Sequence, residues 1–301
     1  MMVLQYKPPP YSEKLGTILN SVDQLRPLPT SVMNILRALD NPDTSVTEIA
    51  RLFELDQALT VEVLHTANSA GFGYSTPCTS VPEAVMRLGF NQIRTAVMRR
   101  SVSSPLSRRL RGYRLGAGAL WNHSIDAAQI ARLIAKEIAY PHTEEAYVAG
   151  LLHDMGKLLL DQFVLEDYHK IVRMMEEQQI SVWQAEEKLF GIDHARMGGM
   201  MAVKWNLPNS LVDAIQHHHL PSLAWAYKEL GAIVNIANAF TPKDSTSLAG
   251  QDGRMVNPIA LEILHLDLEK LDQLWARISQ KIKFASPAED DADGLNEHAT
   301  N

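Results

Sequence analysis

The stretch "AGLLHDMGKLLL" (residues 149–160) places a histidine and an aspartate, His153 and Asp154, inside a run of apolar side chains. The apolar residues around the pair have helical spacing, which predicts a buried helix over residues 143–160. Histidine and aspartate are common metal ligands, but one ion needs several donors that converge on a single point. The stretch therefore predicts a helical domain with a buried polar site, whose other members lie elsewhere in the chain.

The rest of the chain shares this helical periodicity. Glycine and proline separate segments whose apolar residues recur every three to four positions, and the alternation typical of strands is scarce. Ser45, followed three residues later by Glu48, forms the capping box typical of a helix N-terminus. We predict an all-α fold in which an N-terminal bundle of short helices packs on a C-terminal helical domain. The predicted parts are an N-terminal extension (1–19), the short-helix bundle (20–114), the longer-helix domain (115–285) and a polar, acidic tail expected to be disordered (286–301).

The composition predicts a soluble, cytoplasmic protein. The chain has one cysteine, Cys78, which excludes an intramolecular disulfide and a zinc site built from several thiolates. No stretch approaches the roughly 20 apolar residues that span a bilayer, and the N-terminus lacks the pattern of a secretory signal. The formal net charge of -7 argues against general nucleic-acid binding. We therefore expect neither a membrane nor nucleic acid as a partner.

Positive charge is concentrated in one segment. Residues 84–125 contain eight arginines and no acidic residue. One interpretation is a solvated face whose arginines pair with acids from the rest of the chain. The other is a surface for an anionic ligand, nucleic acid or an acidic partner, since arginine favours geometry-specific contacts with anions. The residues that would form this surface are Arg99, Arg100, Arg108 and Arg109.

Further donors for the polar site lie in three other segments. They are His123 in "LWNHS", His194 in "GIDHARMGG" and the triplet His217–His219 in "AIQHHHLP". A single histidine on an apolar helix is more often a hydrogen-bonded core residue than a ligand, and we interpret His65 and His142 that way. The triplet alone could be a solvated helix end, where positive charge is favourable. Taken together, the segments favour one shared polar site over unrelated explanations.

Longer motifs surround these residues. In the N-terminal half they are "LRPLPTSVMNILRAL", "FELDQALTVEVLHTANSAGFG" and "VPEAVMRLGFNQIRTAVM". In the C-terminal half they are "GLLHDMGKLLL", "HARMGGMMAVKWNLP" and "AIQHHHLP". With these motifs, residues 20–285 resemble the HDOD family, a bacterial signalling-output branch of the HD superfamily of metal-dependent phosphohydrolases. The resemblance implies an HD-type helical domain in the C-terminal part and a site for a divalent metal such as iron, manganese or zinc.

The resemblance also implies roles for single residues. The metal ligands would be His123, His153, Asp154, His194, His218 and His219, with Asn238 where the family pattern has a last aspartate. In an active protein, Asp154 and Lys157 would be catalytic, with Lys157 near a substrate phosphate. Asn238 keeps the shape of an aspartate but not its charge, so metal binding should be weak or absent. The Gly-Tyr-Pro signature of cyclic-dinucleotide hydrolases is also missing after the triplet, where the chain reads "LPSLAWAYKEL".

These departures favour a regulator over an enzyme. We expect an HDOD signalling-output module that acts through a signalling protein partner or a small ligand such as a nucleotide, with a partly degraded metal site. The alternative is a metal-dependent phosphohydrolase of nucleotides or cyclic dinucleotides, because the histidine set and the His153–Asp154 pair are retained.

Overall fold

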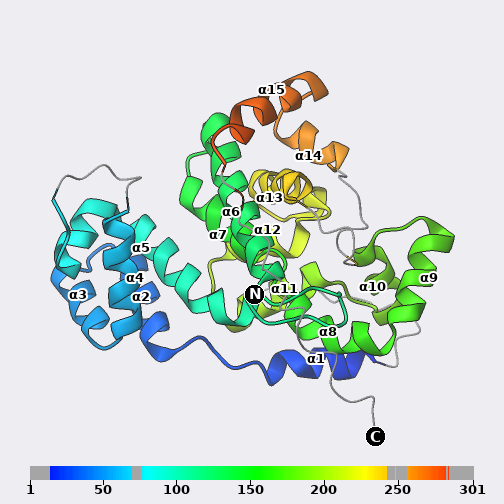
Figure 1. Cartoon of the computed structure of the whole chain (residues 1–301), viewed down its shortest axis with the longest axis horizontal. Helices are drawn as coiled ribbons and strands as arrows, with labels where there is room; N and C mark the ends of the chain where they lie inside the picture. Colours follow the sequence, from blue (N-terminus) through cyan, green and yellow to red (C-terminus); the bar gives the residue numbers. More distant parts are fainter. Residues whose placement is uncertain (1–13, 70–75, 243–247, 249–255, 283, 285–301) are drawn as a thin grey trace, which may run out of the picture.

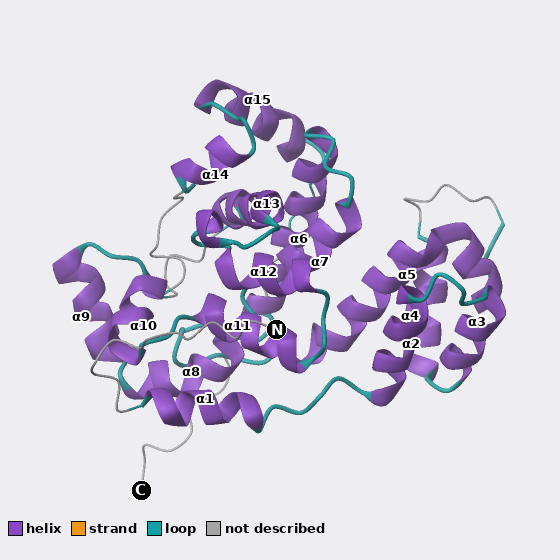
Figure 2. Ribbon diagram, turned by 180° about the vertical axis from the view of Figure 1, so that it is seen from behind, coloured by secondary structure: helices purple, strands orange, loops and turns teal. Residues whose placement is uncertain are grey.

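The chain folds into helices arranged in two parts, as Figures 1 and 2 show. The computed structural model describes residues 14–69, 76–242, 248, 256–282 and 284, and the acidic tail predicted to be disordered lies outside these residues. The N-terminal bundle consists of α2 (Thr30–Asp40), α3 (Val46–Glu54), α4 (Gln57–Ala67) and the beginning of α5 (Val81–Leu106).

Two of the bundle helices, α3 and α4, begin at residues whose side chains cap them. The Ser45 hydroxyl accepts a hydrogen bond from the Glu48 backbone N–H, and the Glu48 carboxylate accepts one from the Ser45 N–H, so the predicted capping box is confirmed. Asp56 caps α4 in the same way, with its carboxylate 3.1 Å from the Leu59 nitrogen. The apolar faces of the four helices meet in a core whose fully buried members include Ile35, Ile49, Phe53, Val63 and Ile93.

Helix α5 connects the two parts. The sequence predicts that this helix ends near Val97, but it continues to Leu106 and packs against α7 of the C-terminal part. A kink interrupts it at Gly89, where φ is 71°, a left-handed conformation that glycine adopts without steric cost. The extension places Arg99 and Arg100 on a helix.

The C-terminal part is built around α6, α7 and α13, which pack against one another, with the α11–α12 pair alongside. Its helices are α6 (Ala119–Glu137), α7 (Thr143–Leu152), α8 (Lys157–Glu166), α9 (Tyr168–Gln178), α10 (Val182–Phe190), α11 (His194–Lys204), α12 (Asn209–His217), η2 (Pro221–Leu223), α13 (Lys228–Phe240), α14 (Pro258–Ile263) and α15 (Leu268–Ser279). The predicted all-α fold, with an N-terminal helical bundle packed on a C-terminal helical domain, is confirmed. Among the described residues, β structure is limited to an isolated bridge between Leu110 and Leu115.

The continuous helix predicted over residues 143–160 is wrong, because a turn interrupts it at residues 153–156. In this turn, backbone hydrogen bonds join residues three positions apart. The Met155 N–H donates to the Leu152 carbonyl oxygen (3.0 Å), and the Lys157 N–H donates to the Asp154 carbonyl oxygen (3.1 Å). Gly156 lets α11 approach this turn, since a Cβ atom on it would lie 2.0 Å from the His194 carbonyl oxygen. The His153–Asp154 pair therefore lies in a turn that faces the start of α11.

The first helix, α1 (Leu15–Asp23), packs against α8 and α11 of the C-terminal part, below which it runs in Figure 1. Polar contacts at both ends hold it there. The Lys14 ammonium lies 2.7 Å from the Asp167 carboxylate, and the Trp205 indole N–H donates to the Arg26 carbonyl oxygen at 3.1 Å. The periodicity of the sequence does not predict this contact, because it joins segments about 150 to 180 residues apart.

In the part of the chain that the structure describes, we find no helix with the length and apolar character needed to cross a membrane.

Candidate metal centre

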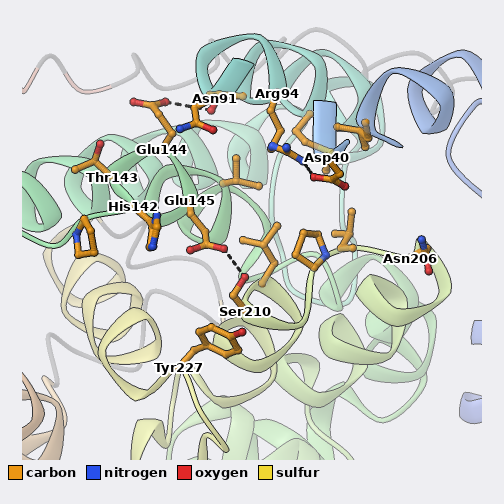
Figure 3. Close-up of a pocket in the computed structure, with 18 of the residues that line it drawn as sticks. Asp40, Asn91, Arg94, His142, Thr143, Glu144, Glu145, Asn206, Ser210 and Tyr227 are labelled. Atoms are coloured by element: carbon orange, nitrogen blue, oxygen red, sulfur yellow. Dashed lines mark hydrogen bonds and ion pairs between the residues drawn. The ribbon is translucent and has the colours of Figure 1, made fainter. Parts of the chain in front are cut away.

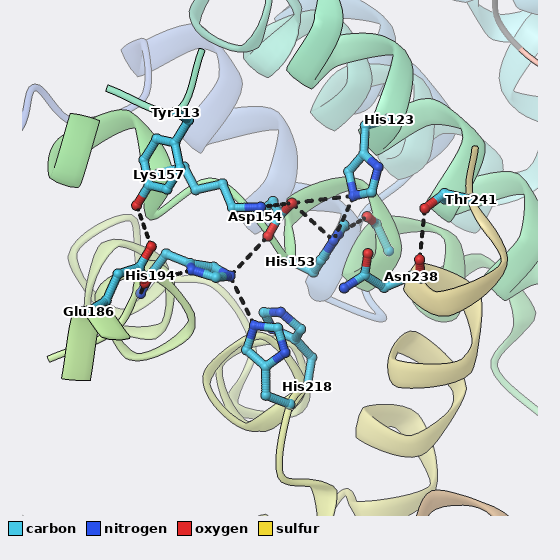
Figure 4. Close-up of polar contacts among 12 residues, drawn as sticks. Tyr113, His123, His153, Asp154, Lys157, Glu186, His194, His218, Asn238 and Thr241 are labelled. Atoms are coloured by element: carbon cyan, nitrogen blue, oxygen red, sulfur yellow. Dashed lines mark hydrogen bonds and ion pairs between the residues drawn. The ribbon is translucent and has the colours of Figure 1, made fainter. Parts of the chain in front are cut away.

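Residues from four separate segments meet between α6, α11 and the ends of α7 and α12 (Figure 4). They form two groups, and within each group the ligand atoms lie within 4.8 Å of one another. One group is His123 with His153 and Asp154, and the other is His194 with His218 and His219. Asp154 joins the two groups. Its Oδ2 atom lies 3.2 Å from His123 Nε2, and its Oδ1 atom lies 3.2 Å from His194 Nε2. We call these six residues the histidine centre.

Three of the histidines are held in one orientation by hydrogen bonds from Nδ1. His153 donates to the Gly150 carbonyl oxygen (2.7 Å) and His218 donates to the Ile215 carbonyl oxygen (2.8 Å). His194 donates to the Glu186 carboxylate (2.7 Å). Because these oxygens can only accept, Nδ1 carries the proton in each ring and Nε2 faces the centre. Metal-ligating histidines are typically fixed in this way.

The residues fit a divalent metal ion. His218 Nε2 and Asp154 Oδ1 are buried and have no hydrogen-bond partner, which is costly for polar atoms in a protein interior. His194 Nε2 and His219 Nε2 lie only 2.9 Å apart. A cation between these atoms would satisfy them together. Imidazole nitrogens with one carboxylate suit iron, manganese or zinc.

Burial and neighbouring charges set the protonation of the centre. Burial lowers the pKa of His123 to about 4, although Asp154 opposes this shift. Burial also holds the pKa values of His218 and His219 well below 6.5, so all three rings are neutral at pH 7. His194 differs: burial lowers its pKa, but the Glu186 and Asp154 carboxylates together more than compensate and raise it to about 9.

Lys157 lies inside the centre. Its side chain is buried, and its ammonium donates to Asp154 Oδ2 at 2.6 Å. Burial raises the pKa of Asp154, but His153 and Lys157 together hold it well below its usual value. The resemblance placed Lys157 near a substrate phosphate, whereas in this structure its charge compensates that of Asp154.

Asn238 takes the place of the expected last aspartate. It is half-buried on α13, and Figure 4 shows its side-chain amide directed toward His153. Thr241 donates its hydroxyl to the Asn238 carbonyl oxygen at 2.7 Å, at the end of the helix. The position adds an amide to the centre, but no negative charge.

A comparison with protein families identifies the family of this chain. The model of the HDOD domain matches residues 25–221. The chain belongs to the HDOD family.

Individual relatives agree with this fold. An HDOD domain protein of unknown function from Geobacter sulfurreducens is 25% identical, with a TM-score of 0.59, and the match covers 89% of this chain and 98% of the other. A Shewanella amazonensis SB2B protein, provisionally named a phosphohydrolase, has a TM-score of 0.66 at 24% identity over 87% of this chain and 93% of its own, which shows the fold alone. An uncharacterized protein of Treponema pallidum (strain Nichols) is 29% identical over 236 residues, 74% of this chain. The chain spans 43% of that relative's length.

Several residues that support the histidine centre were not identified from the sequence. Asn235 donates its side-chain N–H to the His218 carbonyl oxygen at 2.8 Å, and Asn257 donates to the His219 carbonyl oxygen at 3.0 Å. The buried Glu186 on α10 is bonded to His194. The available signals were an acid and an asparagine on otherwise apolar helix faces, and neither indicates a partner many residues away.

His217 points to a different group from its neighbours in the triplet. Its Nδ1 atom donates to the Asp213 carboxylate at 2.9 Å. Asp213 also accepts the backbone N–H groups of Trp225, Ala226 and Tyr227, at 3.0 to 3.1 Å. His217 and Asp213 therefore fix the loop before α13, and His217 stays outside the centre.

The four arginines of the predicted anion surface have different surroundings. The Arg99 side chain bonds to Glu62 on α4, with Nε 3.1 Å from the carboxylate, and Arg108 donates to the Leu158 carbonyl oxygen of α8. Arg100 and Arg109 are exposed. Arg99 and Arg108 therefore bond to different parts of the HDOD fold.

A cavity of about 530 Å³ lies between the two parts of the fold (Figure 3). The Arg94–Asp40 ion pair (2.6 Å) lies on its bundle side, and the hydrogen bond from Ser210 to Glu145 lies on the opposite side. Thr95 of α5 donates to Glu144 of α7 at 3.1 Å and joins the two sides. The lining residues of this cavity include no member of the histidine centre.

Proposed function

We propose that this HDOD protein is a signalling-output module in which a divalent ion at the histidine centre stabilises one conformation. The observation that carries this proposal is the burial of the donor groups. His153, Asp154 and His218 are 0% exposed and His194 is 1% exposed, whereas the His123 side chain is 19% exposed. A phosphoester substrate has to contact the ion and its bound water. A closed centre suits an ion that holds helices together better than one that acts on a substrate.

The charges of the centre support the same proposal. Lys157 already compensates the charge of Asp154, and Asn238 brings no second carboxylate. A dication would then meet one carboxylate and a fixed ammonium, which lowers its affinity compared with a centre that has two carboxylates. Modest affinity would let the occupancy of the centre respond to the metal supply.

The output of such a module would be a contact with a signalling protein or a nucleotide. Of the four arginines predicted for an anionic partner, Arg100, Arg108 and Arg109 are exposed. Arg108 is already bonded to the Leu158 carbonyl oxygen, so Arg100 and Arg109 are the candidates for this contact. We expect Arg100→Ala with Arg109→Ala to weaken binding to an acidic partner at low salt. Unchanged binding would remove the arginine surface from the proposal.

The second candidate function is phosphoester hydrolysis, which the retained donor set favours. A divalent ion, when bound, would supply an activated water and polarise the phosphate. The Lys157 ammonium would have to leave Asp154 to reach a phosphate oxygen, and His123 lies at the more exposed edge of the centre.

Metal analysis of the purified chain tests both candidates. Wild type, Asn238→Asp and the control Asn91→Asp, which adds the same charge at an exposed position on α5, are titrated with Mn²⁺ and Zn²⁺. We expect Asn238→Asp to bind about tenfold more tightly, equivalent to about 1.4 kcal/mol, because a carboxylate attracts a dication and part of that attraction is offset by desolvation of the added charge. Asn91→Asp should behave like wild type.

Phosphodiesterase assays on the same proteins separate the two functions. The regulatory proposal expects metal binding without hydrolysis of nucleotides or cyclic dinucleotides by the wild type. A wild type that binds stoichiometric metal and hydrolyses one of them is an enzyme, and the regulatory proposal is then wrong. If neither wild type nor Asn238→Asp binds metal, the metal centre itself is refuted.

A further inference from the structure

Glu186 is a buried acid at the edge of the histidine centre. It lies on α10, is 0% exposed and accepts three hydrogen bonds. Its Oε2 atom accepts from the backbone N–H of His194 (2.8 Å) and from Nδ1 of the same ring (2.7 Å). Its Oε1 atom accepts from the Tyr113 hydroxyl (2.7 Å). Figure 4 shows this chain of contacts from Tyr113 through Glu186 to His194.

His194 needs this support more than the other oriented histidines do. His153 and His218 each donate to a backbone carbonyl three residues earlier, Gly150 and Ile215. His194 is the first residue of α11, and its Nδ1 donates to Glu186 on another helix, α10. The positive end of the helix dipole also disfavours electron donation from a ring at this position, and a carboxylate offsets that effect.

We propose that Glu186 is a positioning residue for the metal centre, and that Tyr113 holds Glu186 in place. By accepting hydrogen bonds from the backbone N–H and from Nδ1 of His194, Glu186 keeps a proton on Nδ1 and directs Nε2 toward Asp154 and His219. Its charge makes Nε2 a stronger donor to a metal ion. This inference rests on the proposed metal binding.

Tyr113 connects the centre to the segment between the two parts of the fold. This side chain is fully buried in residues 107–118, which link α5 to α6, and its ring centroid lies 5.8 Å from the Lys157 ammonium. The neighbouring Gly112 donates its N–H to the Asp161 carboxylate at 2.8 Å. Through its hydrogen bond with Tyr113, Glu186 therefore contacts the segment that leads to the N-terminal bundle.

A purely structural role is a poor account of Glu186. A buried carboxylate carries a large desolvation cost, and apolar residues of similar size often stabilise a fold at least as well. Its three bonds go to the Tyr113 hydroxyl and to the backbone N–H and the ring Nδ1 of His194, a histidine of the centre. That arrangement is expected of a group that orients a ligand.

The test is a Co²⁺ titration of the full chain, followed by d–d absorption. Glu186→Gln keeps the shape of the side chain and removes its charge, so we expect about 10- to 100-fold weaker Co²⁺ binding and a changed absorption spectrum. The matched control is Glu187→Gln, which removes the same charge from the same helix. Glu187 pairs with Arg196 at 3.0 Å, so this variant should keep the wild-type affinity and spectrum.

A second variant keeps the test decisive if Glu186→Gln fails to fold. Tyr113→Phe removes the hydroxyl that donates to Glu186 Oε1, which then stays buried without this hydrogen bond. Like Glu186→Gln, this variant should weaken Co²⁺ binding, by about tenfold. Wild-type affinity and spectrum in the folded variant or variants would overturn the inference while leaving metal binding intact. A wild type that binds no Co²⁺ would instead refute the proposed function, and the inference with it.

Discussion

The close approach of Gly156 to α11 predicts a large effect of a single methyl group. Gly156 has a φ of -62°, which alanine adopts without strain, so Gly156→Ala tests sterics alone. The added Cβ would lie 2.0 Å from the His194 carbonyl oxygen and 2.6 Å from the Gly198 nitrogen, and both are backbone atoms. Since Cβ contacts below 3.0 Å essentially do not occur, α8 and α11 must separate by at least 1.0 Å, the difference between 3.0 and 2.0.

This separation should lower both stability and metal affinity. Overpacking costs about 1–3 kcal/mol, and we expect the upper end because neither contacting atom can rotate away. At about 2–4 °C per kcal/mol, a loss of 3 kcal/mol lowers the melting temperature by about 6–12 °C. Metal sites tolerate only about 0.2 Å in their distances, so a shift of His194 by this amount should also weaken binding at least tenfold.

Urea unfolding and Mn²⁺ titration of Gly156→Ala measure the two effects. The matched control is Gly16→Ala on α1, where a Cβ meets nothing within 4 Å. That variant should be neutral or more stable by about 0.4–1 kcal/mol, because it restricts the unfolded chain. If Gly156→Ala proves as stable as wild type and binds metal equally well, the close packing of α8 on α11 is not what holds His194 against Asp154.

Two further predictions concern buried charges. Lys157→Met removes the ammonium 2.6 Å from Asp154, so metal-free protein should lose about 3–5 kcal/mol in the free energy of unfolding. Part of this should return with Zn²⁺ in urea unfolding, and an equal loss with and without Zn²⁺ would contradict the prediction. Burial raises the pKa of Asp213, but His217 and three backbone N–H groups lower it from 3.8 to about 2. The ionised carboxylate therefore stabilises the fold above pH 3.8, and this contribution disappears as the pH falls toward 2. The stability difference between wild type and Asp213→Asn should shrink over that range, and a difference independent of pH would argue against the Asp213 contacts.

Local patterns predicted most of the fold. The capping box at Ser45 and Glu48 depends on residues three positions apart, and the structure has the predicted bonds. Apolar periodicity likewise predicted the all-α class, because helical hydrogen bonds form within one segment. Helix ends were less predictable: α5 continues to Leu106 since it packs across both parts of the fold, and packing across parts leaves no local signal.

The histidine centre shows the same division. The sequence, with its family resemblance, indicated the six donor residues and the missing charge at Asn238, and their roles as ligands stay predictions. It did not indicate that the helix over residues 143–160 breaks at His153, or that Lys157 bonds to Asp154. Both depend on how closely α11 packs against the turn.

By itself, the sequence determined that this chain is helical, that a helix begins after Ser45, and which side chains could bind a cation. The tertiary structure decided which of those side chains meet. Glu186 reaches His194 from another helix, and Tyr113 reaches Glu186 across 73 residues of sequence. The physical reason is range: capping and periodicity are set by neighbours within a few residues, whereas a buried polar site forms only when packing brings distant segments within hydrogen-bond distance.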